Sequence, residues 1–156
     1  ISYQPHRIFT SALIHADITH LIMNLGGILM VRFFLMGIGL RSKTFFLQFI
    51  LIGVYVDFLI TWLYERILYV FFNYYSNIAV LGFSGIICAF FGFILLSSIF
   101  GKKNFLGLKV DLRRNIEIYK MSKTICLITL FWSFLPGISL IGHLTGFIAG
   151  CLMFLV

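Results

Sequence analysis

A serine and a histidine that lie far apart in the sequence each stand among glycines at the start of a long apolar run. Ser84 belongs to the tetrapeptide GFSG at 82–85, and His143 belongs to the pentapeptide GHLTG at 142–146. A serine hydroxyl is a weak nucleophile until a neighbouring base takes its proton, and a neutral imidazole can act as that base. Ser84 and His143 are therefore a candidate nucleophile and general base if the fold brings them together.

Two further polar residues could stabilise the negative charge that such a reaction develops. His20 and Asn24 are four residues apart in an apolar run, so a helix would present them on one face. A tetrahedral intermediate needs hydrogen-bond donors aimed at its oxyanion. The two side chains, together with the backbone N–H of Ser84 at a helix N-terminus, are candidate donors.

The composition indicates that these residues belong to a membrane domain. Of the 156 residues, 61% are hydrophobic and only 11% are charged, and the mean hydropathy is +1.06. An average soluble domain has about a quarter charged residues, and a soluble core of this size could not bury so much apolar surface. We therefore expect an all-α, polytopic transmembrane helical bundle. Because the sequence begins at Ile1 and has no signal-peptide pattern, we expect residues 1–156 to be one domain, truncated at its N-terminus.

A hydrocarbon core of about 30 Å requires roughly 20 apolar residues in a helix. Five candidate runs are present, at 18–36, 45–64, 84–100, 124–135 and 138–156. The fourth is short, so its helix is expected to extend back through Tyr119, with two lysines reaching toward the headgroups. Pro136-Gly137 predicts a tight turn before the fifth run. The link at 101–123 alternates apolar and charged residues, which fits either an interfacial segment or a solvated loop.

The basic residues give the chain a formal net charge of +7 and gather on one side of the expected spans. Ten of the 12 lysines and arginines lie in or beside the links after the first and third runs, and only Arg7 and Arg66 lie on the other side. The positive-inside rule makes those links cytoplasmic, so the first, third and fifth spans run inward from the outer face. The polar residues of these three spans then lie at a similar depth in the membrane. No carboxylate is at that depth to orient His143, which predicts a Ser–His pair rather than a triad. This distribution of charge also favours anionic membrane lipids over nucleic acid as partners.

Small residues at helical spacing would let the helices of the candidate site approach closely. The two stripes are Gly85, Ala89 and Gly92, and Gly142, Gly146 and Gly150. The three cysteines lie inside apolar runs, without metal-ligand spacing or a disulfide framework, and are expected to be core side chains: Cys88, Cys126 and Cys151. We expect neither a metal nor another cofactor.

Three motifs on alternate spans resemble the rhomboid family of intramembrane serine proteases. The family's pattern of a His, four residues, a second His, three residues and an Asn is present as His15, His20 and Asn24. Its GxSG motif is present at Gly82–Gly85, and its last-helix pattern of a His, two residues, a Gly, three residues and a Gly begins at His143. The match covers nearly the whole chain, in the family's order.

The resemblance implies roles for these residues. Ser84 would be the nucleophile and His143 the general base, with His20, Asn24 and the Ser84 amide in the oxyanion hole and His15 as a structural partner nearby. It implies a six-helix core of which this chain holds the second to sixth helices. It also implies cleavage of single-pass transmembrane proteins near the outer face. A multi-pass protein of the plasma (inner) membrane, with its active site outward, fits the charge distribution.

Two positions depart from the family pattern. Family members usually have Tyr or Phe four residues after the serine, stacked on the catalytic histidine, and this chain has Cys88 there. The acidic residue that often follows the second family helix is absent, because residues 37–41 read GIGLR.

Two rival functions are an inactive rhomboid-like protein that binds membrane helices, and a transporter. Inactive relatives typically lose the serine or the histidine, whereas this chain has both Ser84 and His143. A transporter would need paired charges along a path through the membrane, and the sequence offers none.

Overall fold

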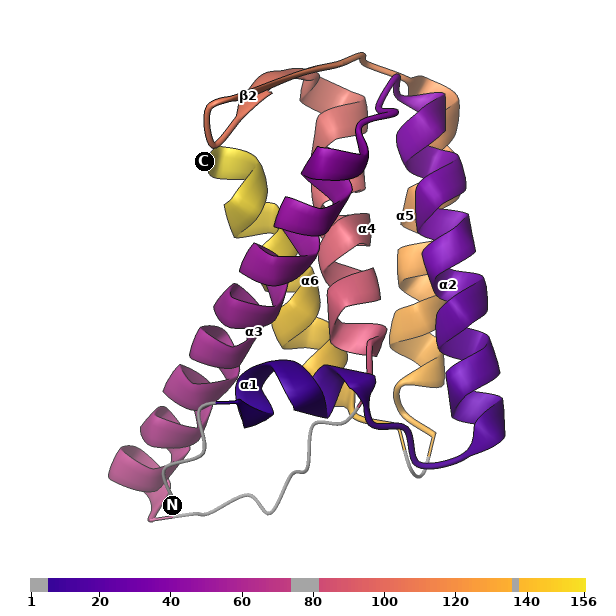
Figure 1. Cartoon of the computed structure of the whole chain (residues 1–156). Helices are drawn as coiled ribbons and strands as arrows, with labels where there is room; N and C mark the ends of the chain where they lie inside the picture. The colour runs from indigo at the N-terminus through magenta and orange to yellow at the C-terminus, as the bar shows by residue number, and fades with distance from the viewer. Residues whose placement is uncertain (1–5, 74–81, 136–137) are drawn as a thin grey trace.

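The computed structural model describes residues 6–73, 82–135 and 138–156, which form a helical bundle with a small β-hairpin at one end (Figure 1). In chain order the elements are α1 (Arg7–Thr10), the 3-10 turn η1 (Ser11–Leu13), α2 (Ile18–Gly37), α3 (Lys43–Phe72), α4 (Ser84–Phe100), β1 (Lys102–Phe105), β2 (Leu108–Leu112), α5 (Ile116–Trp132) and α6 (Leu140–Leu155). The expected helical bundle is confirmed. The turn expected at Pro136-Gly137 lies outside the described residues.

Four apolar helices correspond to expected spans, and two of them pass a simple test of length and composition. Among the described helices, α2 and α3 are long and apolar enough to cross a membrane, while α4 and α6 are shorter apolar helices. The third expected run, 84–100, has the bounds of α4. The second was expected at 45–64, but α3 continues to Phe72 and ends where Asn73 adopts a left-handed conformation with φ of 48°.

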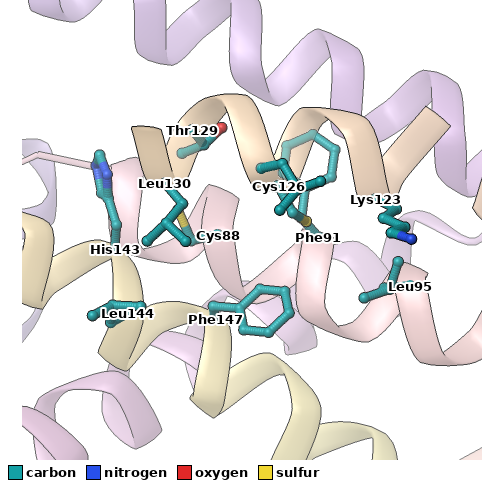
Figure 2. A pocket seen from close by; sticks show the side chains of 11 residues that line it. Cys88, Phe91, Leu95, Lys123, Cys126, Thr129, Leu130, His143, Leu144 and Phe147 are labelled. Atoms are coloured by element: carbon teal, nitrogen blue, oxygen red, sulfur yellow. The ribbon is translucent and has the colours of Figure 1, made fainter. Parts of the chain in front are cut away.

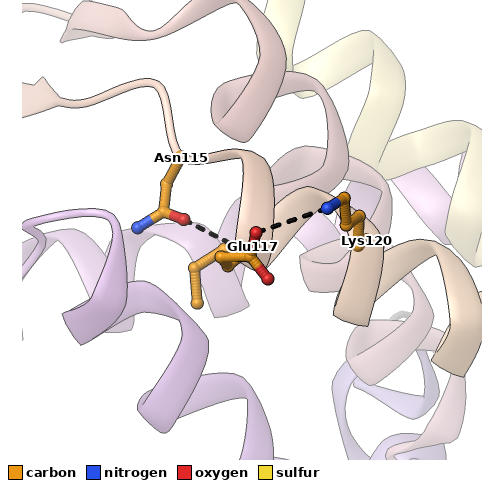
Figure 3. Close-up of polar contacts among 4 residues, drawn as sticks. Asn115, Glu117 and Lys120 are labelled. Carbon is orange, nitrogen blue, oxygen red and sulfur yellow. Dashed lines mark hydrogen bonds and ion pairs between the residues drawn. The ribbon is translucent and has the colours of Figure 1, made fainter.

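Helix α5 begins at Ile116, before the fourth expected apolar run at 124–135, because the polar residue Asn115 caps its first turn (Figure 3). The Asn115 side chain accepts a hydrogen bond from the backbone N–H of Ile118 at 3.0 Å, which satisfies one of the free donors of the first turn. Glu117 and Lys120 pair across the next turn at 3.4 Å. The expected extension of this helix back through Tyr119 is therefore confirmed.

Helix α4 lies in the middle of the bundle, between α2, α3, α5 and α6 (Figure 1). It is apolar on every side, and a helix of that kind is stable only where neighbours cover all its faces. Phe90 and Phe93 are almost fully buried, and the ring of Phe90 stacks on that of Phe49 from α3 with centroids 4.1 Å apart. The residue that begins this central helix is Ser84.

The link at 101–123 is not a simple loop, so that alternative is wrong: it contains a β-hairpin and the first turns of α5. Strands β1 and β2 pair antiparallel, and the two-residue turn between them has Leu106 and Gly107 at φ of 45° and 82°, as tight hairpins require. The alternation of apolar and charged residues is a strand pattern that buries one face. Phe105 is fully buried against the ring of Phe45, with centroids 5.1 Å apart. The hairpin thus closes the end of the bundle opposite the start of α4 (Figure 1).

Candidate active site

The backbone before Ser84 lies directly against the two polar side chains of α2. Gly82 has a left-handed conformation with φ of +92°, which favours glycine. A Cβ at this position would lie 2.9 Å from Nε2 of His20 and 3.2 Å from Nδ2 of Asn24. Glycine is therefore needed twice here, once for the turn and once for the close approach. The contact brings His20 and Asn24 to the start of α4.

Asn24 is buried, at 5% exposure, and its Nδ2 donor has no hydrogen-bond partner among the described residues. Its neighbour His20 contacts the ring of His15, with centroids 5.1 Å apart and the planes at 73°. His15 in turn bonds through Nδ1 to the carbonyl oxygen of Leu13 at 3.1 Å. His15, the expected structural partner, thus lies beside His20, and the buried amide donor of Asn24 is left available.

Helices α4 and α6 touch through backbone at two levels. A Cβ at Gly146 would lie 2.9 Å from the Cα of Gly85, and a Cβ at Gly150 would lie 2.8 Å from the Cα of Ala89. Any larger residue would push the helices apart, so the two small-residue stripes face each other. Ser84 directly precedes Gly85, and His143 lies one helical turn before Gly146. Both residues are therefore at the same end of the crossing of α4 and α6.

Gly85 also lies directly against the side chain of Asp57 on α3. A Cβ there would lie 2.5 Å from Oδ2 of Asp57, and 3.4 Å from the carbonyl oxygen of Gly142. Asp57 is buried, at 8% exposure, and its Oδ1 has no partner among the described residues. The first turn of α4 is therefore held between an acid from α3 and the first turn of α6.

The imidazole of His143 makes its hydrogen bond to Ser133, a residue that sequence reasoning missed. The distance from Ser133 Oγ to His143 Nδ1 is 2.5 Å, and Ser133 also donates to the carbonyl oxygen of Thr129 at 2.6 Å. Within the described part of the chain, no hydrogen bond joins His143 to Ser84. The signal in the sequence was a lone serine at the end of the fourth apolar run, ten residues before the histidine.

An apolar cavity of about 290 Å³ opens beside His143, between α4, α5 and α6. Figure 2 shows His143 at one end of this pocket and Lys123 at the other. Cys88, where the family usually has an aromatic ring, is part of its wall. The remaining lining residues are Phe91, Leu95, Cys126, Leu127, Thr129, Leu130, Leu144 and Phe147.

Comparison with known proteins identifies the family. The model of the rhomboid domain matches residues 2–156, nearly the whole chain. Comparisons with curated proteins and with solved structures found no match. Together with the apolar helices α2 and α3, the match makes this an integral membrane protein. The chain belongs to the rhomboid family of intramembrane serine proteases.

Proposed function

We propose that this protein is an intramembrane serine endopeptidase that cuts transmembrane segments of single-pass membrane proteins. The observation that carries the proposal is the contact of Gly82 with His20 and Asn24. It puts two hydrogen-bond donors from α2 against the backbone that leads into Ser84. A nucleophile and the donors for its oxyanion then share one corner of the bundle.

In the proposed reaction, the Ser84 hydroxyl loses its proton to Nε2 of His143 and attacks the carbonyl carbon of the scissile peptide bond. The tetrahedral oxyanion accepts hydrogen bonds from Nδ2 of Asn24, from His20 and from the N–H of Ser84. Two observations support these donors: Asn24 Nδ2 has no partner among the described residues, and Phe83 provides no side-chain cap to the first turn of α4. His143 then protonates the leaving amine, and water hydrolyses the acyl-enzyme.

The proposed substrates and location follow from the surroundings of Ser84. Peptide bonds within a helix are shielded by their own hydrogen bonds, so substrate helices need Gly, Pro or polar residues that unwind near the site. Ten of the 12 basic residues lie toward the hairpin end of the bundle, and the positive-inside rule predicts that this end is cytoplasmic. We therefore propose a multi-pass protein of the plasma membrane, with anionic lipid around its basic end and its active site near the outer face.

The test is cleavage of a transmembrane substrate by the purified protein in detergent, together with labelling of the serine by a fluorophosphonate. Wild type should cleave and be labelled, and Ser84→Ala should do neither. The matched control is Ser97→Ala on the same helix, because Ser97 is fully buried yet its hydroxyl has no partner among the described residues. Cleavage by Ser84→Ala would contradict the proposal. A wild type that binds the substrate without cutting it would favour the inactive, helix-binding alternative.

A further inference from the structure

Ser133 joins the end of α5 to the first turn of α6 through a side-chain bond to His143. We infer that Ser133 is a positioning residue, which holds His143 in the tautomer protonated at Nδ1 and leaves Nε2 as the base. The inference rests on the proposed function, in which His143 takes the proton of Ser84. It would make the site a linear chain of nucleophile, base and orienting hydroxyl.

The direction of the two hydrogen bonds follows from what each group can donate. A serine hydroxyl has one proton and two lone pairs, whereas a backbone carbonyl can only accept. Ser133 Oγ lies 2.6 Å from the carbonyl oxygen of Thr129, so its proton is engaged there. Its lone pair then faces Nδ1 of His143 at 2.5 Å and accepts a proton from that nitrogen. A neutral imidazole with its proton on Nδ1 has its free lone pair on Nε2.

Burial makes this arrangement specific. Ser133 is 2% exposed, so water cannot replace either partner, and an unpaired buried donor on the imidazole would cost about 1–3 kcal/mol. The other tautomer would present a lone pair at Nδ1 to the lone pair of Ser133, unless the hydroxyl gave up Thr129. The hydrogen bond from Ser133 to the carbonyl oxygen of Thr129 on α5 therefore favours one tautomer of His143 on α6.

Ser133 would also restrain the His143 imidazole, a role that a carboxylate or an aromatic ring could otherwise have. Among the described residues, no carboxylate is hydrogen-bonded to His143, and Cys88 lines a cavity where an aromatic ring could restrain the imidazole. A hydroxyl that both fixes the tautomer and anchors the ring at one nitrogen would supply that restraint. Because a hydroxyl carries no charge, it stabilises the imidazolium less than a carboxylate would, and its removal should be milder than the loss of a triad acid.

The first test reads the tautomer directly and needs no activity. ¹⁵N-histidine NMR of the protein in detergent micelles distinguishes a protonated from an unprotonated ring nitrogen, and His143→Gln identifies the signals of this ring among the four histidines. At a pH where the ring is neutral, we expect protonated Nδ1 and unprotonated Nε2 in wild type, and a mixture of both tautomers in Ser133→Ala. A wild-type ring protonated at Nε2 would overturn the inference.

The second test separates positioning from folding. We expect Ser133→Ala to lower kcat by about 10- to 100-fold with little change in KM, since loss of near-attack geometry acts on the chemical step. The rate of fluorophosphonate labelling should fall in parallel, and Ser133→Thr, which keeps the hydroxyl, should restore both. The control is Ser139→Ala, because Ser139 caps α6 at the N–H of Gly142 without touching a ring nitrogen. Its melting temperature should fall with kcat nearly unchanged.

The outcomes distinguish this inference from the proposed function. A folded Ser133→Ala protein with wild-type kcat would overturn the positioning role while leaving the protease assignment intact. A wild type without cleavage or labelling would overturn the protease assignment, and the NMR measurement would still decide the tautomer. If Ser133→Ala did not fold, the wild-type tautomer alone would decide.

Discussion

The buried side chain of Asn24 has an amide donor without a hydrogen-bond partner among the described residues, and this indicates its role. An amide donor buried without a hydrogen bond costs about 1–3 kcal/mol, so a fold that keeps one needs a reason. The Nδ2 atom lies beside Gly82, at the point where the chain enters α4, and has no partner among the described residues. An oxyanion that forms at Ser84 would supply the missing acceptor.

The first prediction follows from this donor. Asn24→Ala should lower kcat by about 10²–10³-fold, the usual effect of losing one oxyanion donor, while fluorophosphonate labelling of Ser84 remains detectable. The control is Thr19→Ala on the same helix, where the side chain is exposed and should be dispensable. Steady-state cleavage of a transmembrane substrate measures the effect. Wild-type turnover by Asn24→Ala would remove this residue from the oxyanion hole.

The second prediction concerns Cys88 and the cavity beside His143. An apolar ring at position 88 would fill part of the 290 Å³ space, which is lined almost entirely by apolar side chains. Cavity filling commonly adds about 0.5–2 kcal/mol of stability. Cys88→Phe should therefore melt at a higher temperature and cleave at least as fast as wild type, because the ring would pack against the imidazole.

Cys88→Ala is the matched control for the thiol, and it should remain active, since the cysteine is expected to act only as a small core side chain. Thermal melts and turnover of the three proteins decide the matter. A destabilised, slow Cys88→Phe enzyme would mean that the core has closed around sulfur and that the ring overpacks it.

At the residue scale, the sequence was most informative where a motif has fixed spacing. His20 and Asn24 were found because they are four residues apart in an apolar run, and Ser84 because it stands in the GFSG motif at the start of another. Ser133 was not found, because a single serine at the end of an apolar run has no spacing of its own. Its contact with His143 depends on how α5 and α6 lie beside each other, which local patterns do not specify.

Among the elements, the crossing of α4 and α6 decides whether the candidate nucleophile and base can meet. Their backbones touch because glycine on α6 faces Gly85 and Ala89 on α4. The glycine stripes were visible in the sequence, and the close contact that they predicted is confirmed at Gly146 and Gly150. The hairpin was not predicted, although its segment alternates apolar and charged residues: over strands of only four and five residues, such alternation does not distinguish a hairpin from an interfacial segment or a loop.

The third prediction tests this crossing with two matched substitutions. Gly150→Ala should destabilise the protein by about 1–3 kcal/mol, because the new methyl group would overlap the backbone of Ala89 and the helices would have to separate. Gly26→Ala on α2 is the control, since a Cβ there meets nothing within 4 Å. Alanine also favours a helix over glycine by about 1 kcal/mol, so the control should be neutral or stabilising.

Thermal unfolding in detergent measures both variants. Equal melting temperatures for Gly150→Ala and wild type would show that α4 and α6 can move apart without loss, and that the glycine stripe does not determine their approach.

For the whole molecule, the two ends of the bundle differ in charge and in content. The hairpin end holds the link after α2 and the segment from β1 to the start of α5, where most basic residues gather. The other end holds η1, the start of α4 and the start of α6, and thus the candidate site (Figure 1). The basic residues and the candidate site are therefore at opposite ends, and the positive-inside rule predicts that the site faces outward.

The fourth prediction tests that orientation by cysteine labelling in whole cells. Phe72, the last residue of α3, is 71% exposed and lies at the end of the bundle away from the hairpin (Figure 1), whereas Lys109 in the hairpin has a side chain that is 79% exposed. A membrane-impermeant maleimide should label Phe72→Cys in intact cells, but Lys109→Cys only after the cells are permeabilised.

Wild type is the blank for this labelling, because its three cysteines lie within apolar runs, which a polar, membrane-impermeant reagent does not enter. Lys109→Cys removes only a surface ion pair with Asp111, which is worth at most about 1 kcal/mol, so the hairpin should persist. Labelling of Lys109→Cys in intact cells, with Phe72→Cys protected, would invert the orientation. The candidate site would then face the cytoplasm, and substrates would have to unwind near the inner leaflet instead.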